Sequence, residues 1–105
     1  IEVQVTTLDE AVERPIKRPC LLKIDVQGFE LDVLRGGAET LREVDVAFVE
    51  CSFVELYDGQ ALVDEVVPFM LEAGFHFAGV YNLSYSTDGA AIQGDFLFQR
   101  AGEMA

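Results

Sequence analysis

Two short, nearly continuous apolar runs constrain this chain more than any other feature. Residues 21–26 read LLKIDV and residues 44–50 read VDVAFVE, with a carboxylate at or near the end of each run. Such runs suit strands that are buried on both faces of a parallel sheet. Between them, apolar residues recur at helical spacing over 29–41, and Gly36–Gly37 interrupts the stripe and can end its first part. Residues 21–50 therefore predict a β-α-β unit, whose usual size is about 30 residues.

The remainder of the chain predicts one long helix and two further strands. Apolar residues at helical spacing predict a helix over 62–73, which Pro68 should bend or break because proline lacks a backbone N–H. Residues 75–82 and 95–100 are rich in aromatic and β-branched residues and predict strands. The connection 83–94 shows no helical stripe, so these two strands should pair antiparallel.

The first residues predict two small elements. Residues 3–6 favour one more strand, and Thr7 or Asp9 should begin a short helix across 8–13. A chain of 105 residues is long enough for one domain. The predicted fold class is α/β, with parallel strands followed by an antiparallel carboxyl-terminal hairpin.

Charge and composition exclude several classes of function. The chain carries 7 Lys and Arg against 19 Asp and Glu, a net charge of −12 that would repel the phosphates of nucleic acids and of anionic membranes. Half of the residues are hydrophobic, which predicts a packed core. No segment approaches the roughly 18 apolar residues of a membrane span, no secretory signal opens the chain, and two cysteines cannot build a disulfide framework. We therefore expect a cytoplasmic protein with reduced thiols.

Acidic residues at the predicted strand ends are the main candidates for chemistry, because ligands of open α/β sheets bind beyond the carboxyl ends of the strands. Asp25 closes the first run beside Gly28, where a carboxylate is costly to bury unless a ligand, a cation or an amine faces it. Helix capping by Asp25 and Glu30 explains the same pattern equally well. Glu50 has the corresponding place on the next strand, so the two carboxylates could share a proton or a cation. Capping or pairing with a basic residue is the alternative for Glu50.

Other polar groups near these strand ends are weaker candidates. Tyr57 and Asn82 stand in the loops after the second and third predicted strands, where such side chains shape small-molecule pockets but also close ordinary loops. Nucleophilic catalysis by Cys51 is disfavoured because the sole histidine, His76, begins a strand at the opposite end of the sheet. The sequence contains no GxGxxG, GxxxxGK[ST], HExxH or paired CxxC motif, and we assign no metal site.

One segment resembles a known family. Residues 22–36, LKIDVQGFELDVLRG, resemble the signature of the FkbM-like methyltransferases, which runs roughly KIDVEGxExxVLxGA. The chain departs from it mainly at Gln27, where the family usually has Glu, and at Gly37, which stands before Ala38. Weaker resemblance to this family, or to one branch of it, extends to residues 7–9 (TLD), 49–50, 53–60 and 79–82.

The resemblance implies the carboxyl-terminal half of a class I S-adenosylmethionine-dependent methyltransferase. That Rossmann-like fold is a seven-stranded sheet of order 3-2-1-4-5-7-6 with strand 7 antiparallel, and the four core strands predicted above would be strands 4 to 7. In this family the glycine-rich cofactor loop and the ribose-binding acid lie upstream. Since Ile1 is also not an initiator methionine, we expect residues 1–105 to form a single, partial domain that binds S-adenosylmethionine weakly or not at all and is inactive alone.

The resemblance also suggests roles for the candidate residues. Related enzymes typically methylate a hydroxyl group of a sugar or of another small molecule. Asp25 would be the base or would contact the methionine portion of the cofactor. Glu30 and Glu50 would orient groups or ligate a cation, and Tyr57 and Asn82 would contact the substrate. The competing hypothesis is a non-catalytic, acidic α/β interaction module.

The predicted strand over 21–26 would lack a neighbour on one side if the upstream half were missing. An open strand edge is a template for association. We therefore expect either a homodimer through 21–26 or residues 1–6 folding over this edge.

Overall fold

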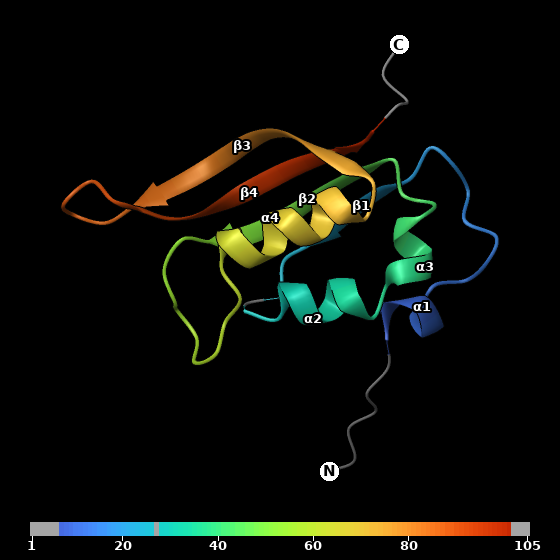
Figure 1. Cartoon of the computed structure of the whole chain (residues 1–105), viewed down its shortest axis with the longest axis horizontal. Coiled ribbons are helices and arrows are strands. Elements are labelled where there is room, and N and C mark those ends of the chain that lie inside the picture. Colours follow the sequence, from blue (N-terminus) through green and yellow to red (C-terminus); the bar gives the residue numbers. More distant parts are fainter. Residues whose placement is uncertain (1–6, 27, 102–105) are drawn as a thin grey trace.

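The computed structural model describes residues 7–26 and 28–101, so the strand predicted over 3–6 and the proposed cover from residues 1–6 lie outside the described part. The protein has a mixed α/β fold with a four-stranded sheet (Figure 1). In chain order the elements are α1 (Leu8–Ala11), β1 (Leu21–Ile24), α2 (Glu30–Arg35), α3 (Ala38–Leu41), β2 (Val46–Ser52), α4 (Val63–Glu72), β3 (Phe75–Tyr85) and β4 (Ala91–Arg100).

The sheet has the order β1-β2-β4-β3. Strands β1 and β2 pair in parallel, with Ile24 opposite Val49, which confirms the predicted β-α-β unit. Strand β4 is antiparallel to both of its neighbours, which confirms the predicted carboxyl-terminal hairpin. Strand β1 is an edge of the described sheet, and Leu21 on it is 63% exposed. The homodimer through this edge stays a prediction.

All four strand predictions differ from the structure in their bounds, and the first strand already ends at Ile24. The second strand begins at Val46 and runs on to Ser52, because β4 continues to pair with it as far as Gln93. Glu50 therefore lies inside β2 and not at its end. The hairpin is also longer than predicted: most of the connection 83–94 joins β3 or β4, and only residues 86–90 remain as the turn.

The helices follow the sequence signals with one exception. Thr7 caps α1 through a capping box with Glu10. The helical stripe over 29–41 divides into α2 and α3 at Gly36–Gly37, as predicted. A break of α4 before Pro68 was wrong, since the helix runs unbroken from Val63 to Glu72. Proline removes one backbone hydrogen bond, and burial of Val66 and Met70 in the core offsets that loss.

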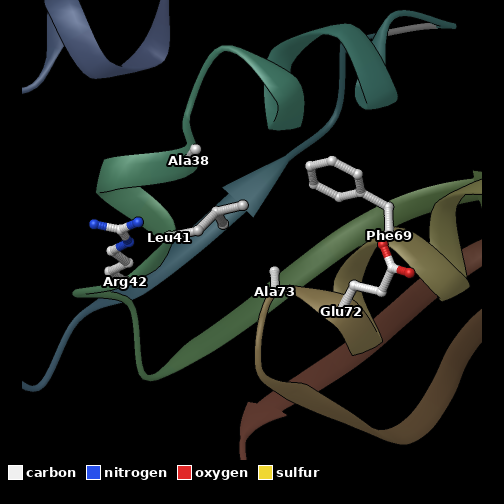
Figure 2. A pocket seen from close by; sticks show the side chains of 6 residues that line it. All are labelled: Ala38, Leu41, Arg42, Phe69, Glu72 and Ala73. Carbon is white, nitrogen blue, oxygen red and sulfur yellow. The ribbon is translucent and has the colours of Figure 1, made fainter.

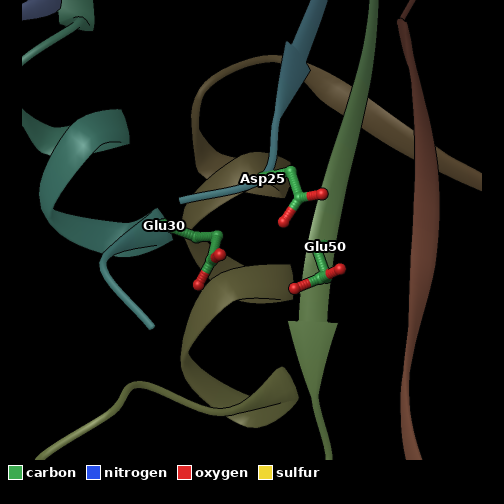
Figure 3. Close-up of side chains that lie close together, drawn as sticks. All are labelled: Asp25, Glu30 and Glu50. Carbon is green, nitrogen blue, oxygen red and sulfur yellow. The ribbon is translucent and has the colours of Figure 1, made fainter. Parts of the chain in front are cut away.

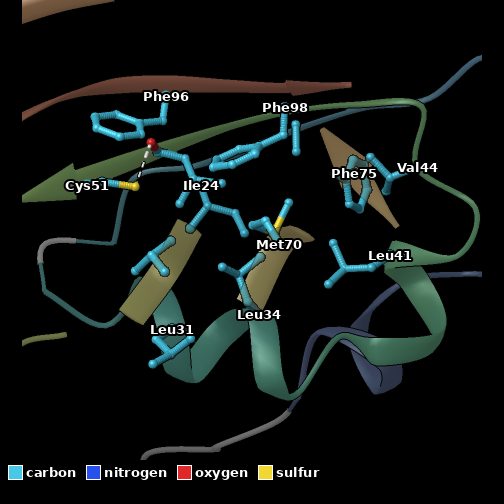
Figure 4. Close-up of a cluster of buried hydrophobic side chains, with 13 residues drawn as sticks. Ile24, Leu31, Leu34, Leu41, Val44, Cys51, Met70, Phe75, Phe96 and Phe98 are labelled. Atoms are coloured by element: carbon cyan, nitrogen blue, oxygen red, sulfur yellow. Dashed lines mark hydrogen bonds between the residues drawn. The ribbon is translucent and has the colours of Figure 1, made fainter. Parts of the chain in front are cut away.

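The core lies between the sheet and the helices α2, α3 and α4 (Figure 4). Alternate residues of β2 and β4 point into it, among them Val49 and Phe98, which are fully buried. The neighbouring residues Phe48 and Leu97 point to the other face and are only partly buried. None of the helices within 7–26 and 28–101 has the length and apolar character required to cross a membrane.

Candidate functional site

Three carboxylates meet at the edge of the sheet where the parallel strands end. Asp25 directly follows β1, Glu50 lies in β2 one residue after the partner of Ile24, and Glu30 opens α2. One oxygen from each of the three lies within 4.8 Å of the others, and Figure 3 shows the three side chains turned toward one another. The predicted closeness of Asp25 and Glu50 is thus confirmed. We call these three residues the acid cluster.

Glu30 is the buried member of the acid cluster, with 4% of its surface exposed. Its carboxylate accepts hydrogen bonds from the backbone N–H groups of Val26 at 3.1 Å and of Gly28 at 3.2 Å. Gly28 has φ +102°, a conformation that favours glycine. Glu30 therefore closes the turn between β1 and α2.

Asp25 does not cap α2. The residue before the helix is Phe29, which makes no side-chain capping bond, and among the described residues no backbone amide donates to Asp25. Its side chain is exposed and faces Glu50. The capping alternative thus fails for Asp25, and Glu30 accepts from amides of the turn before α2 and from none in the helix.

Glu50 is the member whose titration is most disturbed. Burial raises its pKa to about 7, and the negative charges of Asp25 and Glu30 act in the same direction. A hydrogen bond with Asp25 and the charge of Asp95 add to the rise. In the described part of the chain, no Lys or Arg forms an ion pair with these carboxylates, so pairing with a basic residue is wrong for Glu50. With a pKa of about 7, Glu50 can keep its proton near neutral pH and hydrogen-bond to Asp25.

The loop after β2 brings Tyr57 against the turn below the acid cluster. A Cβ atom at Gly28 would lie 2.8 Å from Cδ2 of Tyr57, so the tyrosine ring packs directly on this glycine. Gln60 holds the loop: its side-chain oxygen accepts from the N–H groups of Leu56 and Tyr57, and its amide nitrogen donates to Ser52 Oγ at 2.9 Å. Tyr57 thus lies beside the turn that Glu30 closes, and its predicted role as a substrate contact stays a prediction.

Asn82 is linked to the acid cluster through Asp95. Its side-chain amide donates to Asp95 Oδ2 at 2.9 Å, and Asp95 stands opposite Glu50 in the pairing of β2 with β4. Its predicted place in a loop was wrong: Asn82 lies inside β3, where it has φ 53° at an irregularity of the strand. Asp95, Gln60 and Ser52 were not among the site residues predicted from the sequence. Only the strand alternation around Asp95 could have placed one of them on the face of Glu50.

Cys51 and His76 lie as expected. Cys51 is 2% exposed, burial raises the pKa of its thiol to about 12, and the thiol donates to the carbonyl oxygen of Val49. A thiol in this state is a poor nucleophile. His76 pairs with Gln99 at the far end of the sheet. Neither residue belongs to the candidate site.

Two hollows of the described surface lie away from the acid cluster. One of about 340 Å³ separates α3 from α4 (Figure 2), and its lining is Ala38, Leu41, Arg42, Phe69, Glu72 and Ala73. A second, of about 370 Å³ and almost wholly apolar, lies beside the first residues of β1 and β2. Both are at the end of the sheet where the parallel strands begin, opposite the acid cluster.

Three carboxylates at one point can do two kinds of chemistry. A pair that shares a proton can accept the proton of a bound hydroxyl group. Carboxylate oxygens are also the ligands that hard cations prefer. The absence of a metal therefore stays a prediction, and the geometry establishes only that three acids are gathered where ligands of α/β sheets bind.

Comparison with known proteins identifies the family. The family described as the Methyltransferase FkbM domain matches residues 1–77. The 2-O-methyltransferase NoeI of Sinorhizobium fredii (strain NBRC 101917 / NGR234) is 39% identical over 80 residues, which cover 71% of this chain and 33% of that protein. The match thus spans about a third of the length of this curated relative. No solved structure matches the chain. The predicted resemblance is confirmed, and the chain belongs to the FkbM methyltransferase family.

Proposed function

We propose that this chain is part of an S-adenosylmethionine-dependent enzyme that methylates a hydroxyl oxygen of a sugar or of another small molecule. The observation that carries the proposal is the pair Asp25 and Glu50, two acids that face each other without a basic partner among the described residues. Membership of a methyltransferase family supports the reaction class. The relative's name, 2-O-methyltransferase, supports oxygen as the acceptor atom.

Asp25 is the base in this proposal because it is the exposed member of the pair. A hydroxyl group bound against Asp25 would donate its proton to this carboxylate while its oxygen takes the methyl group, and Glu50 would share that proton. The bond between the methyl carbon and the sulfur would break at the same time, and S-adenosylhomocysteine would leave as a neutral thioether. Glu30 is committed to the turn amides and keeps the turn in place. Positioned acids of this kind contribute typically about 10²- to 10⁴-fold to a rate.

The charge of the acid cluster fits the cofactor. S-adenosylmethionine supplies a methyl group on a sulfonium cation, and its methionine portion carries an ammonium group. Asp25 would lie near this portion, where a negative charge attracts both cations. The cofactor's glycine-rich loop and ribose-binding acid would come from residues upstream of Ile1.

The strand order supports the proposed architecture. If β1, β2, β3 and β4 are strands 4, 5, 6 and 7 of a class I methyltransferase sheet, their order in space must be β1-β2-β4-β3, with β4 antiparallel. This is the order of the described sheet. Strand β1 would then pair on its free edge with a strand formed by upstream residues.

The test uses the complete gene product. Titration calorimetry with S-adenosylmethionine should show binding, and transfer of a labelled methyl group should be measured with hexoses and their methyl glycosides as acceptors. Asp25→Asn should lower kcat at least 100-fold with the fold intact, because it removes the base. Asp32→Asn, an exposed acid in α2, is the matched control and should leave kcat unchanged.

Two results would count against the proposal. Full activity of Asp25→Asn would remove the assignment of the base. Absence of cofactor binding in the complete gene product would favour the competing hypothesis, a non-catalytic interaction module.

A further inference from the structure

Gln60 occupies a buried place between the end of β2 and the loop that carries Tyr57. We propose that Gln60 is a positioning residue: it seats the Tyr57 ring on Gly28 and so makes the loop 53–60 a fixed wall of the methyl-acceptor site. The inference deepens the proposed function and rests on it. Gln60 acts through Tyr57 and touches no reacting atom.

The first support is that both polar atoms of the Gln60 side chain have hydrogen-bond partners. Gln60 is 9% exposed, and a buried amide is costly unless its donors and acceptor are paired. Its oxygen accepts from Leu56 N–H at 2.8 Å and from Tyr57 N–H at 3.3 Å, while its nitrogen donates to Ser52 Oγ at 2.9 Å. Ser52 is 2% exposed and is the last residue of β2. One side chain thus ties the loop to the sheet.

The second support is the contact between Tyr57 and Gly28. A Cβ at Gly28 would lie 2.8 Å from Cδ2 and 3.0 Å from Cγ of Tyr57, so the ring occupies space that only glycine leaves open. The N–H of Gly28 donates to Glu30, which belongs to the acid cluster. Contacts therefore run without a gap from Ser52 through Gln60, Tyr57 and Gly28 to Glu30.

The third support is what the ring presents to solvent. Tyr57 is 44% exposed although its ring packs on Gly28. On the same turn Phe29 is 63% exposed, and in the same loop Leu56 is 46% exposed. An acceptor that binds here meets apolar surface beside carboxylates. This combination suits a sugar ring, whose C–H face is apolar and whose rim carries hydroxyl groups.

The experiment compares four variants of the complete gene product. Gln60→Met has nearly the shape of glutamine but loses the hydrogen bonds to Leu56, Tyr57 and Ser52. Gln60→Glu keeps the accepting oxygens, and the Ser52 hydroxyl can donate to it. Tyr57→Ala removes the ring and leaves the Gln60 bonds in place. Gln99→Met makes the same change as Gln60→Met at the far end of β4 and is the matched control.

Two measurements are made on each variant. Nuclear Overhauser contacts between the Tyr57 ring and the Gly28 α-protons report the seating of the ring. Steady-state kinetics report the KM of the hexose acceptor that the wild type uses best, together with kcat and the dissociation constant of S-adenosylmethionine.

We expect the substitutions to change the ring contact and the acceptor KM while kcat and cofactor binding change little. Gln60→Met should lose the ring contact and raise the acceptor KM at least 10-fold, with kcat changed less than about threefold and cofactor binding unchanged. Gln60→Glu should recover most of the contact and of the KM. Tyr57→Ala should reproduce the rise in KM, which keeps the test valid if Gln60→Met fails to fold. Gln99→Met should match the wild type.

Other results overturn the inference. If Gln60→Met keeps the ring contact, Gln60 does not position Tyr57. If the contact is lost while the acceptor KM is unchanged, or if Tyr57→Ala has the wild-type KM, the loop is not a wall of the acceptor site. If the wild type transfers no methyl group at all, the proposed function itself fails and the acceptor role falls with it, while the ring contact still reports whether Gln60 seats Tyr57.

Discussion

Two groups of acidic side chains in this molecule differ in what surrounds them. In the amino-terminal clasp, which we define as residues 7–14 packed on residues 36–43, the carboxylate of Asp9 accepts from the N–H groups of Glu39 and Thr40 and from the Thr40 hydroxyl. Arg14 pairs with it at 3.3 Å. In the acid cluster, three carboxylates face one another, and within the described residues no basic side chain pairs with them.

The difference appears in the direction of the pKa shifts. Burial alone would raise the pKa of Asp9, but the hydrogen bonds of Thr40 and Glu39 and the charge of Arg14 hold it below its ordinary value. Burial and the negative charges of three neighbouring acids raise the pKa of Glu50 to about 7. An acidic residue by itself therefore indicates neither structure nor function. The partners of its charge distinguish a structural clasp from a candidate functional site.

The largest expected effect on stability separates Asp9 from Asp25. Asp9→Ala leaves two backbone N–H groups at the start of α3 without their acceptor and should lower the free energy of unfolding by about 2 kcal/mol. Asp25→Ala should change it by less than about 0.5 kcal/mol, because it removes an exposed charge that is repelled by its neighbours. Urea unfolding of both variants at pH 7.5 is the measurement. A greater loss in Asp25→Ala than in Asp9→Ala would reverse the comparison.

A smaller effect tests how closely the clasp packs. A Cβ at Gly37 would lie 2.6 Å from Cδ2 of Leu8, whereas the nearest atom to a Cβ at Gly36 is Thr7 Cβ at 3.2 Å. Gly37→Ala should therefore cost about 1 to 2 kcal/mol through overpacking. Gly36→Ala, the matched control, should cost clearly less. Thermal unfolding of the two variants measures this difference in stability. Equal melting temperatures would mean that Leu8 moves aside freely.

The same packing explains a departure from the family signature. Gly37 stands before Ala38 where the signature has no second glycine, and the structure gives it a steric reason, because Leu8 of the TLD segment fills the space of its missing side chain. The sequence alone predicted only that Gly37 helps to interrupt the helix. Its contact joins segments about 30 positions apart, which no local pattern reports.

Site residues in or next to strands were easier to predict from the sequence than site residues in loops. The closeness of Asp25 and Glu50 was predictable, because parallel strands end at one edge of a sheet. The bonds of Gln60 to Ser52 were not, since they depend on the path of an irregular loop. The extent of β4 was missed for a related reason: Gly94 interrupts the apolar pattern, and the structure shows that it makes room for Leu83 and Val80. Periodicity predicts elements, but it does not predict what loops place between them.

The smallest expected effect is on how stability depends on pH. Rising pH should lower the stability that Glu50 contributes and raise the stability that Asp9 contributes. Glu50 has a folded pKa of about 7 against an ordinary value of 4.5, so between these values the unfolded chain has lost the proton while the folded protein keeps it. Stability from this group is complete below pH 4.5 and is lost as the pH rises toward 7. Asp9 behaves in the opposite way: its contribution is present above 3.8 and is lost as the pH falls through its lower folded value.

Glu50→Gln should abolish this loss. Relative to the wild type, its free energy of unfolding should therefore rise by about 1 kcal/mol between pH 4.5 and pH 7.5, a modest value because solvent screens a partly exposed carboxylate. Asp25→Asn should produce part of the same rise, since one of the charges that disfavour ionised Glu50 is gone. Urea unfolding at the two pH values measures both differences. A difference between Glu50→Gln and wild type that stays constant from pH 4.5 to 7.5 would mean that Glu50 is an ordinary surface acid. The proposal that Glu50 shares a proton with Asp25 would then lose its support.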